Sequence, residues 1–195
     1  MGLQSGDEQL QPPALSSAAE KKVEELKKRY PSVRSAVMPA LYIAQEELGW
    51  LSDSAIRWVA ARLDLPPSHV LEVATFYTMY YKQPVGRYHV QVCRTLSCML
   101  CGARGLTARL RERLGIAPGE ITADGMWSYE EVECLGSCGT APMVEINDVF
   151  FENLTAESLD ALMDRIEAEQ PDLRYSTVQE ELGAGLAGVK KSQIL

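Results

Sequence analysis

The chain has 195 residues, 46% of them hydrophobic, and a formal net charge of −8. This length allows one domain, or a small domain with an appended subdomain, and the acidic balance argues against nucleic acid or an anionic membrane surface as the main partner. No stretch approaches the ~18 consecutive apolar residues of a membrane-spanning helix, so direct membrane insertion is not expected.

The first 17 residues, MGLQSGDEQLQPPALSS, have neither the basic start of a secretory signal nor the Arg-rich character of a transit peptide. Their polar, proline-containing composition predicts a disordered tail over residues 1–17. We therefore expect a cytoplasmic protein. Because the cytosol is reducing, structural disulfides are disfavoured there, and clustered cysteines indicate metal ligands or redox groups.

Residues 18–83 show helical periodicity with brief connections, which predicts a small helical bundle. Ser17 and Glu20 form a capping-box pattern at the start of the first helix. Asp53 is expected to cap the third helix, and Pro66 to precede the fourth. The apolar positions expected on the buried faces are Val33, Val37, Leu41, Ala44, Leu48, Ile56, Val59, Ala60, Leu63, Val70, Val73, Ala74 and Tyr77.

From Pro84 the pattern changes to alternation of apolar and polar residues. The order of elements up to residue 170 is strand, helix, strand, hairpin, helix, which predicts a small α/β layer sandwich. Residues 171–195 are Gly-rich and weakly patterned, and are expected to form a disordered or partner-covering extension. The predicted elements are a strand over residues 86–93, a helix over 99–114, a strand over 124–134, a hairpin over 142–151 and a helix capped by Thr155 and stopped by Pro171.

Four of the five cysteines form two spaced pairs, Cys93-x4-Cys98 and Cys134-x3-Cys138. Each pair follows a predicted strand, so both pairs can lie at one end of the same sheet. A [2Fe–2S] cluster needs four thiolates around two irons, and two loops usually supply two each. Glycines next to the cysteines would let backbone N–H groups approach the sulfurs. The two pairs therefore predict a site for such a cluster.

Other sites would use the cysteines differently. Cys93-x4-Cys98-x2-Cys101 matches the ligand spacing of a plant-type ferredoxin, but Cys101 lies in the predicted helix. A dithiol site at Cys98 and Cys101 would leave Cys134 and Cys138 unexplained. A structural zinc site takes four cysteines but favours tighter spacing, and unligated buried thiols are the remaining alternative. The two-pair set is favoured over these, and Cys101 is expected to pack in or near the core.

The two histidines are expected to be surface or capping residues rather than ligands. His69 stands at a predicted helix start, and His89 on the polar face of a predicted strand. No Ser-His-Asp set, carboxylate pair or Walker motif is present in the sequence. The chain is therefore expected to hold a redox centre but no substrate site of its own.

Three segments closely resemble one family: ATFYTMYYKQPVGRYHVQVCRTLSCMLCG, YEEVECLGSCGTAPMVEIND and ENLTAESL. The family is the thioredoxin-like [2Fe–2S] subunit of NADH:quinone oxidoreductase (respiratory complex I), known as the 24 kDa or E subunit. The resemblance covers roughly residues 18–168.

This resemblance implies an α/β fold, with a thioredoxin-like [2Fe–2S] ferredoxin domain over residues 84–170 preceded by the small helical bundle over residues 18–83. Cys101 matches no ligand of the family. In thioredoxin-like folds a cis proline often precedes a strand beside the active loop, so a cis Ala141–Pro142 peptide is expected. The family's cluster ligands fall on Cys93, Cys98, Cys134 and Cys138.

The implied function is that of an electron-transfer subunit without an NADH site. The implied partner is a flavoprotein subunit that binds FMN and NADH and passes one electron to the cluster of this chain. Other peripheral-arm subunits of complex I would hold the chain at the inner face of the cell membrane. Related subunits serve NAD-linked hydrogenases and formate dehydrogenases, and a zinc-bearing assembly module without redox activity is a further alternative. The cysteine pattern does not separate these assemblies.

Overall fold

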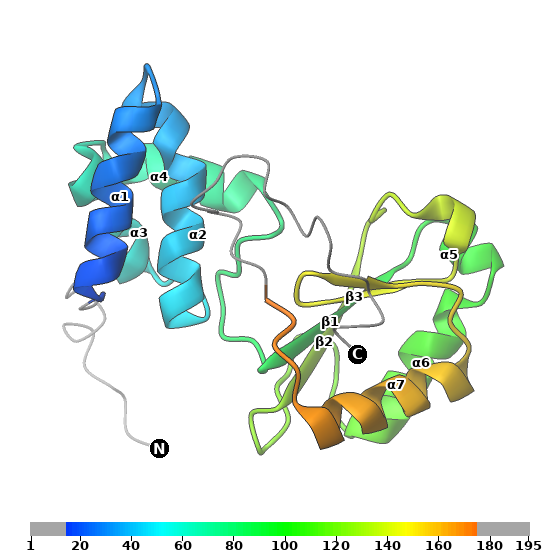
Figure 1. Cartoon of the computed structure of the whole chain (residues 1–195). Helices are drawn as coiled ribbons and strands as arrows, with labels where there is room; N and C mark the ends of the chain where they lie inside the picture. Colours follow the sequence, from blue (N-terminus) through cyan, green and yellow to red (C-terminus); the bar gives the residue numbers. More distant parts are fainter. Residues whose placement is uncertain (1–14, 175–195) are drawn as a thin grey trace. The chain divides into compact units, whose positions relative to one another are not determined.

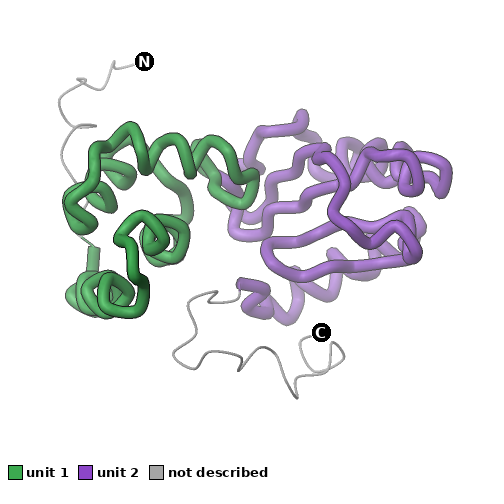
Figure 2. The backbone as a smooth tube through the Cα atoms, turned by 90° about the horizontal axis from the view of Figure 1, so that it is seen from above, with its two compact units in different colours: residues 1–84, 176–181 green, residues 85–175, 182–195 purple. Residues whose placement is uncertain are grey.

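The computed structural model describes residues 15–174 (Figure 1). Most of the predicted N-terminal tail and of the predicted C-terminal extension lie outside this range. Among the described residues, those up to Pro84 and those from Val85 form two compact units, each with its own hydrophobic core (Figure 2). No helix between residues 15 and 174 is both long and apolar enough to cross a membrane.

The first unit is a bundle of short helices around a buried apolar core. Val23, Leu41, Val59 and Val70 are fully buried and come from four different helices. Tyr80 is also buried, and its hydroxyl donates a hydrogen bond to the backbone oxygen of Met38 at 3.0 Å. The elements are α1 (Ser17–Arg29), a 3₁₀ turn η2 (Val33–Ala36), α2 (Val37–Leu48), α3 (Asp53–Leu63) and α4 (Pro67–Phe76).

Two predicted helix caps are wrong by one residue. Ser16, not Ser17, caps α1, and Ser52, not Asp53, caps α3. Each of these two capping serines has an extended backbone, so its hydroxyl reaches the amide three residues on, at 3.1 Å in α1 and 3.2 Å in α3. The predicted cap at Thr155 is confirmed, since its side chain accepts from the amide of Ser158.

The second unit is a four-stranded mixed sheet with the helices α6 and α7 packed against it, which confirms the predicted α/β class (Figure 1). The strand order is β2-β1-β3-β4, with β1 parallel to β2 and antiparallel to β3. The elements are β1 (Tyr88–Cys93), α5 (Leu96–Leu100), α6 (Ala103–Leu114), β2 (Trp127–Val132), a 3₁₀ turn η3 (Cys138–Thr140), β3 (Val144–Ile146), β4 (Val149–Phe151) and α7 (Ala156–Glu169).

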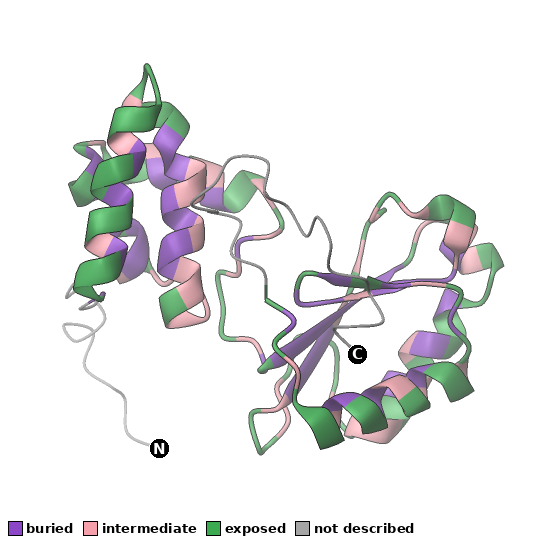
Figure 3. Ribbon diagram, in the orientation of Figure 1, coloured by how far each residue is buried: buried purple, intermediate pink, exposed green. Residues whose placement is uncertain are grey.

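The central strand β1 is buried along its whole length (Figure 3). His89 is only 3% exposed, so the prediction that it is a surface or capping residue is wrong. Its ring nitrogens lie 2.8 Å from the Ser128 hydroxyl and 3.1 Å from the Glu130 carboxylate, both on β2. Buried polar groups need such partners, and the neighbouring strand supplies them.

Gly86 packs against β2 so closely that no side chain fits there. A Cβ atom at this position would lie 2.5 Å from the backbone carbon of Trp127 and 2.7 Å from the nitrogen of Ser128. We expect Gly86→Ala to lower the free energy of unfolding by about 1–3 kcal/mol through overpacking, measured by urea unfolding.

The matched control is Gly105→Ala in α6, where a Cβ atom would meet nothing within 4 Å. Alanine is the better helix former by about 0.5–1 kcal/mol, so this variant should be as stable as the unaltered chain or more so. Equal stability of the two variants would contradict the close packing at residue 86.

Candidate metal centre

The parallel pairing of β1 with β2 brings the two cysteine pairs to one end of the sheet. Cys93 is the last residue of β1 and lies in register with Val132 at the end of β2. Cys98 follows in α5, while Cys134 and Cys138 lie in the loop after β2. Because parallel strands end at the same edge, this arrangement follows the one that the strand pattern predicts.

The two pairs differ in exposure. Cys93 and Cys98 are each 2% exposed, whereas Cys134 and Cys138 are exposed on their loop. The sulfurs of Cys134 and Cys138 lie 3.6 Å apart. Cys93 is close enough to both exposed cysteines for electrostatic interaction, and Cys98 to Cys138. The site therefore has a buried half and a half that faces outward.

Hydrogen bonds favour the thiolate form of one cysteine in each pair. Burial raises the pKa of Cys93, but the Thr95 hydroxyl, 3.3 Å from the sulfur, together with the N–H groups of Thr95 and Leu135, outweighs burial and lowers it. The Gly136 N–H donates to the Cys134 sulfur at 3.4 Å and lowers the pKa of Cys134. Each of these sulfurs thus has backbone donors in place.

The other cysteine in each pair is held protonated. Burial, followed by the hydrogen bond with Cys93, raises the pKa of Cys98 to about 11. The hydrogen bond with Cys134 raises the pKa of Cys138. Two neighbouring thiols resist ionising together because like charges repel. Four thiolates at this site therefore require a positive centre among them.

This donor set fits a [2Fe–2S] cluster. Its thiols come as two pairs on two loops, one pair for each iron, and backbone N–H groups approach the sulfurs of Cys93, Cys98 and Cys134. Such donors offset the negative charge of a thiolate-bound cluster. Within residues 15–174, no three His, Cys, Asp or Glu side chains gather closely enough to hold a single metal ion. A single zinc ion, which needs four donors around one point, fits this arrangement less well.

Cys101 is exposed, so the prediction that it packs in or near the core is wrong. The predicted helix over residues 99–114 is two helices: α5 ends at Leu100, and α6 begins at Ala103. Gly102 between them has φ 104°, in the left-handed region that favours glycine. The Cys-Gly step is the signal for this break, because glycine commonly follows a helix end.

Two contributors to the site carry no cysteine, and reasoning from the cysteine spacing missed them. One is Thr95, whose hydroxyl faces Cys93. The other is Met143, whose N–H is directed at the sulfur of Cys98. Met143 follows the Ala141–Pro142 peptide, which is cis as predicted. The position of Met143 near Cys98 results from the chain path after β2, which the spacing of the cysteines does not reveal.

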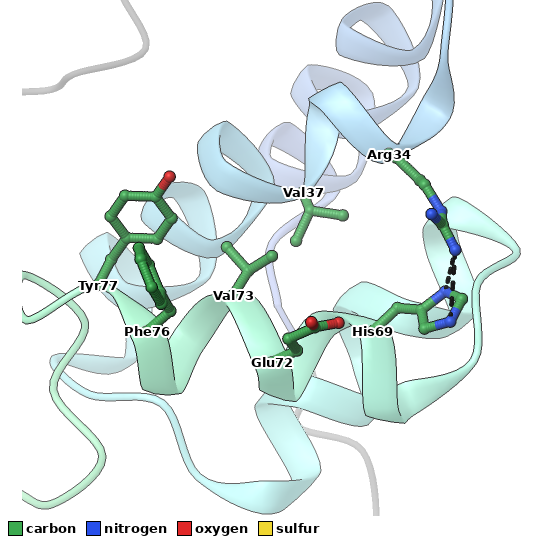
Figure 4. Close-up of a pocket in the computed structure, with 7 residues that line it drawn as sticks. All are labelled: Arg34, Val37, His69, Glu72, Val73, Phe76 and Tyr77. Atoms are coloured by element: carbon green, nitrogen blue, oxygen red, sulfur yellow. Dashed lines mark hydrogen bonds between the residues drawn. The ribbon is translucent and has the colours of Figure 1, made fainter.

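A cavity of about 320 Å³ lies in the first unit and is not part of this centre (Figure 4). It is lined by Arg34, His69, Glu72 and apolar side chains of α2 and α4. The Arg34 guanidinium lies 3.2 Å from a ring nitrogen of His69. No thiol lines the cavity, so it has no part in cluster binding.

The exposure and pKa of the thiols predict their order of alkylation in the cluster-free chain. Thiolate is the reactive form, so exposed Cys134, with its lowered pKa, should react with iodoacetamide at neutral pH at least about tenfold faster than buried Cys98. Peptide mapping by mass spectrometry measures each rate, and the urea-unfolded chain is the control in which the two rates converge. Equal rates in the folded chain would refute this assignment.

Comparison with known proteins gives the same family from sequence and from structure. Residues 23–167 match the model of the thioredoxin-like [2Fe–2S] ferredoxin family. The NADH-quinone oxidoreductase E subunit 2 of Rhizobium meliloti is 46% identical over 142 residues, 73% of this chain and 84% of that protein. NADH-quinone oxidoreductase subunit 2 of Thermus thermophilus is 46% identical over 144 residues, 72% of this chain and 80% of that protein.

Among solved structures, an NAD⁺-reducing [NiFe]-hydrogenase is similar with a TM-score of 0.58 and 26% identity. The match covers 71% of this chain but only 23% of the hydrogenase chain. The extent and identity of the matches to the curated relatives decide the assignment. The chain belongs to the thioredoxin-like [2Fe–2S] ferredoxin family, within the group formed by the E subunits of NADH-quinone oxidoreductase.

Proposed function

We propose that this chain is an electron-transfer subunit of an NADH:quinone oxidoreductase and that it carries one [2Fe–2S] cluster. The carrying observation is the meeting of two cysteine pairs at the ends of the parallel strands β1 and β2. Relatives with 42–46% identity that are named as E subunits of this oxidoreductase support the same function. The chain acts as one component of the enzyme, because it holds a redox centre without a nucleotide site.

The proposed ligands are Cys93 and Cys98 for one iron and Cys134 and Cys138 for the other. When bound, the cluster supplies the uptake and release of one electron at a time. The N–H groups of Leu135 and Gly136 stabilise the negative charge on the sulfurs. The buried pair excludes water from one side of the centre, while the exposed loop leaves the other side open to a partner.

The proposed partner is the flavoprotein subunit that binds NADH and FMN, with further peripheral-arm subunits around it. In this assembly the chain lies on the cytoplasmic side, at the inner face of the cell membrane. Leu96 and Leu100 on α5 are 75% and 78% exposed, although Cys98 between them is buried. Exposed apolar side chains of this kind mark contact surfaces. We propose that the flavoprotein docks over α5 and the Cys134–Cys138 loop.

An NAD⁺-reducing hydrogenase is the second candidate assembly, supported by the structural similarity at 26% identity. The electron-transfer role of the chain is the same in both assemblies. Copurification of the tagged chain from its own cells distinguishes them, since quinone-module subunits accompany the first assembly and a [NiFe] subunit accompanies the second.

Serine substitution tests the ligand set. We expect Cys93→Ser, Cys98→Ser, Cys134→Ser and Cys138→Ser each to lose the cluster or to change its EPR spectrum, because a hydroxyl is a poorer ligand for iron than a thiolate. Cys101→Ser is the matched control and should keep the spectrum of the unaltered chain. Loss of the cluster in Cys101→Ser, with retention in Cys134→Ser, would instead establish the plant-type ligand set.

Substitution of the exposed leucines tests the docking surface. We expect Leu96→Ser combined with Leu100→Ser to weaken binding to the flavoprotein at least about tenfold, which is about 1.4 kcal/mol, while the EPR spectrum of the cluster stays unchanged. Leu71→Ser, at a residue of α4 that is 43% exposed, is the control and should bind normally. Normal flavoprotein binding by the α5 variant would rule out this surface.

A further inference from the structure

The loop that carries Cys138 is attached to the end of β4 by one carboxylate. Glu152 directly follows β4, and its Oε1 accepts hydrogen bonds from the Ser137 hydroxyl at 2.5 Å and from the Thr140 hydroxyl at 2.7 Å. The two hydroxyl oxygens are themselves 2.6 Å apart. Ser137 and Thr140 stand on either side of Cys138 in the chain. The carboxylate therefore closes the turn from both of its ends.

Backbone hydrogen bonds extend the same attachment. The Asn153 N–H donates to the backbone oxygen of Thr140 at 2.8 Å, and the Leu154 N–H donates to that of Pro142 at 3.0 Å. The Thr140 N–H donates to the Ser137 oxygen at 3.2 Å and closes the turn. Residues 152–154 thus hold residues 137–142 in place along their length.

A carboxylate suits this position better than an amide. Both hydroxyls donate to one oxygen of Glu152, and hydrogen bonds to an ionised acceptor are the stronger kind. An amide oxygen could accept the same two bonds, but it carries no charge and brings two donors that need their own acceptors. Glu152 is only half-buried, so its ionised form is tolerated there. It begins the ENLT segment, whose purpose the cysteines alone do not explain.

We propose that Glu152 is a positioning residue for the cluster: it holds the turn over residues 137–140 so that the Cys138 sulfur faces its iron, and its negative charge lowers the reduction potential of the centre. The second effect follows from charge, because a cluster with four thiolates goes from about −2 to about −3 on reduction. A nearby carboxylate opposes this added charge. The inference rests on the ligand set proposed above.

Two substitutions separate position from charge. Glu152→Gln keeps an oxygen that can accept from the two hydroxyls but removes the charge, so the cluster should remain and its midpoint potential should shift to a more positive value. Glu152→Ala removes the acceptor as well. In this variant the fraction of chains that carry a cluster should fall several-fold, and the amides of residues 137–143 should exchange with deuterium faster.

The charge control is Glu112→Gln, at an exposed residue of α6 whose carboxylate pairs with Arg109. It removes the same charge far from the turn along the chain, and its potential and amide exchange should match those of the unaltered protein. All variants are compared in the full-length chain, purified without air, by EPR-monitored redox titration and hydrogen-exchange mass spectrometry.

An unchanged or more negative potential in Glu152→Gln would overturn the role of the charge, and so would an equal positive shift in Glu112→Gln. Unchanged exchange and cluster content in Glu152→Ala would overturn the positioning role. If the alanine variant fails to fold, the potential of the glutamine variant decides the proposal. Absence of a cluster from the unaltered chain would overturn the proposed function instead, and amide exchange in the cluster-free chain would still test the attachment.

Discussion

The parallel pairing of β1 with β2 is the constraint on which the candidate centre depends. Parallel strands end at the same edge, so the cysteine loops that follow them meet although they are far apart in the sequence. The strand β1 is hydrogen-bonded to neighbours on both sides and buried throughout, which makes it a firm base for Cys93. The crossover through α5 and α6 that parallel pairing requires also supplies Cys98. One feature of the sheet topology thus assembles the ligands from both loops.

Electrostatics explains why this site suits a cluster better than free thiols. Without a positive centre, each pair keeps one thiol protonated, since the pKa is lowered at Cys93 and Cys134 and raised at Cys98 and Cys138. Backbone N–H groups already point at three of the sulfurs, where a negatively charged cluster needs them. Glu152, the one carboxylate that the further inference places beside the centre, acts through the hydroxyls that flank Cys138. The donors stabilise the centre, and the carboxylate sets its geometry and its potential.

The parts of this account that could be predicted from sequence are those that depend on local pattern. Alternation identified β1 and β2, and the cysteines at their ends identified the candidate centre. The exposure of Cys101 depends instead on a left-handed backbone at Gly102, which divides a continuous helical pattern. The burial of His89 depends on β1 being the central strand and on partners from β2, which alternation does not reveal. The contributions of Thr95, Met143 and Glu152 arise only once the loops meet in the folded chain.

The most direct test of the central claim is the metal content and EPR spectrum of the full-length chain, purified without air. The account predicts about two irons and two acid-labile sulfides per chain, with an EPR signal that appears when dithionite adds one electron. It also predicts that this signal requires cysteines from both loops. A colourless chain that holds one zinc ion and gives no signal after dithionite would contradict the account.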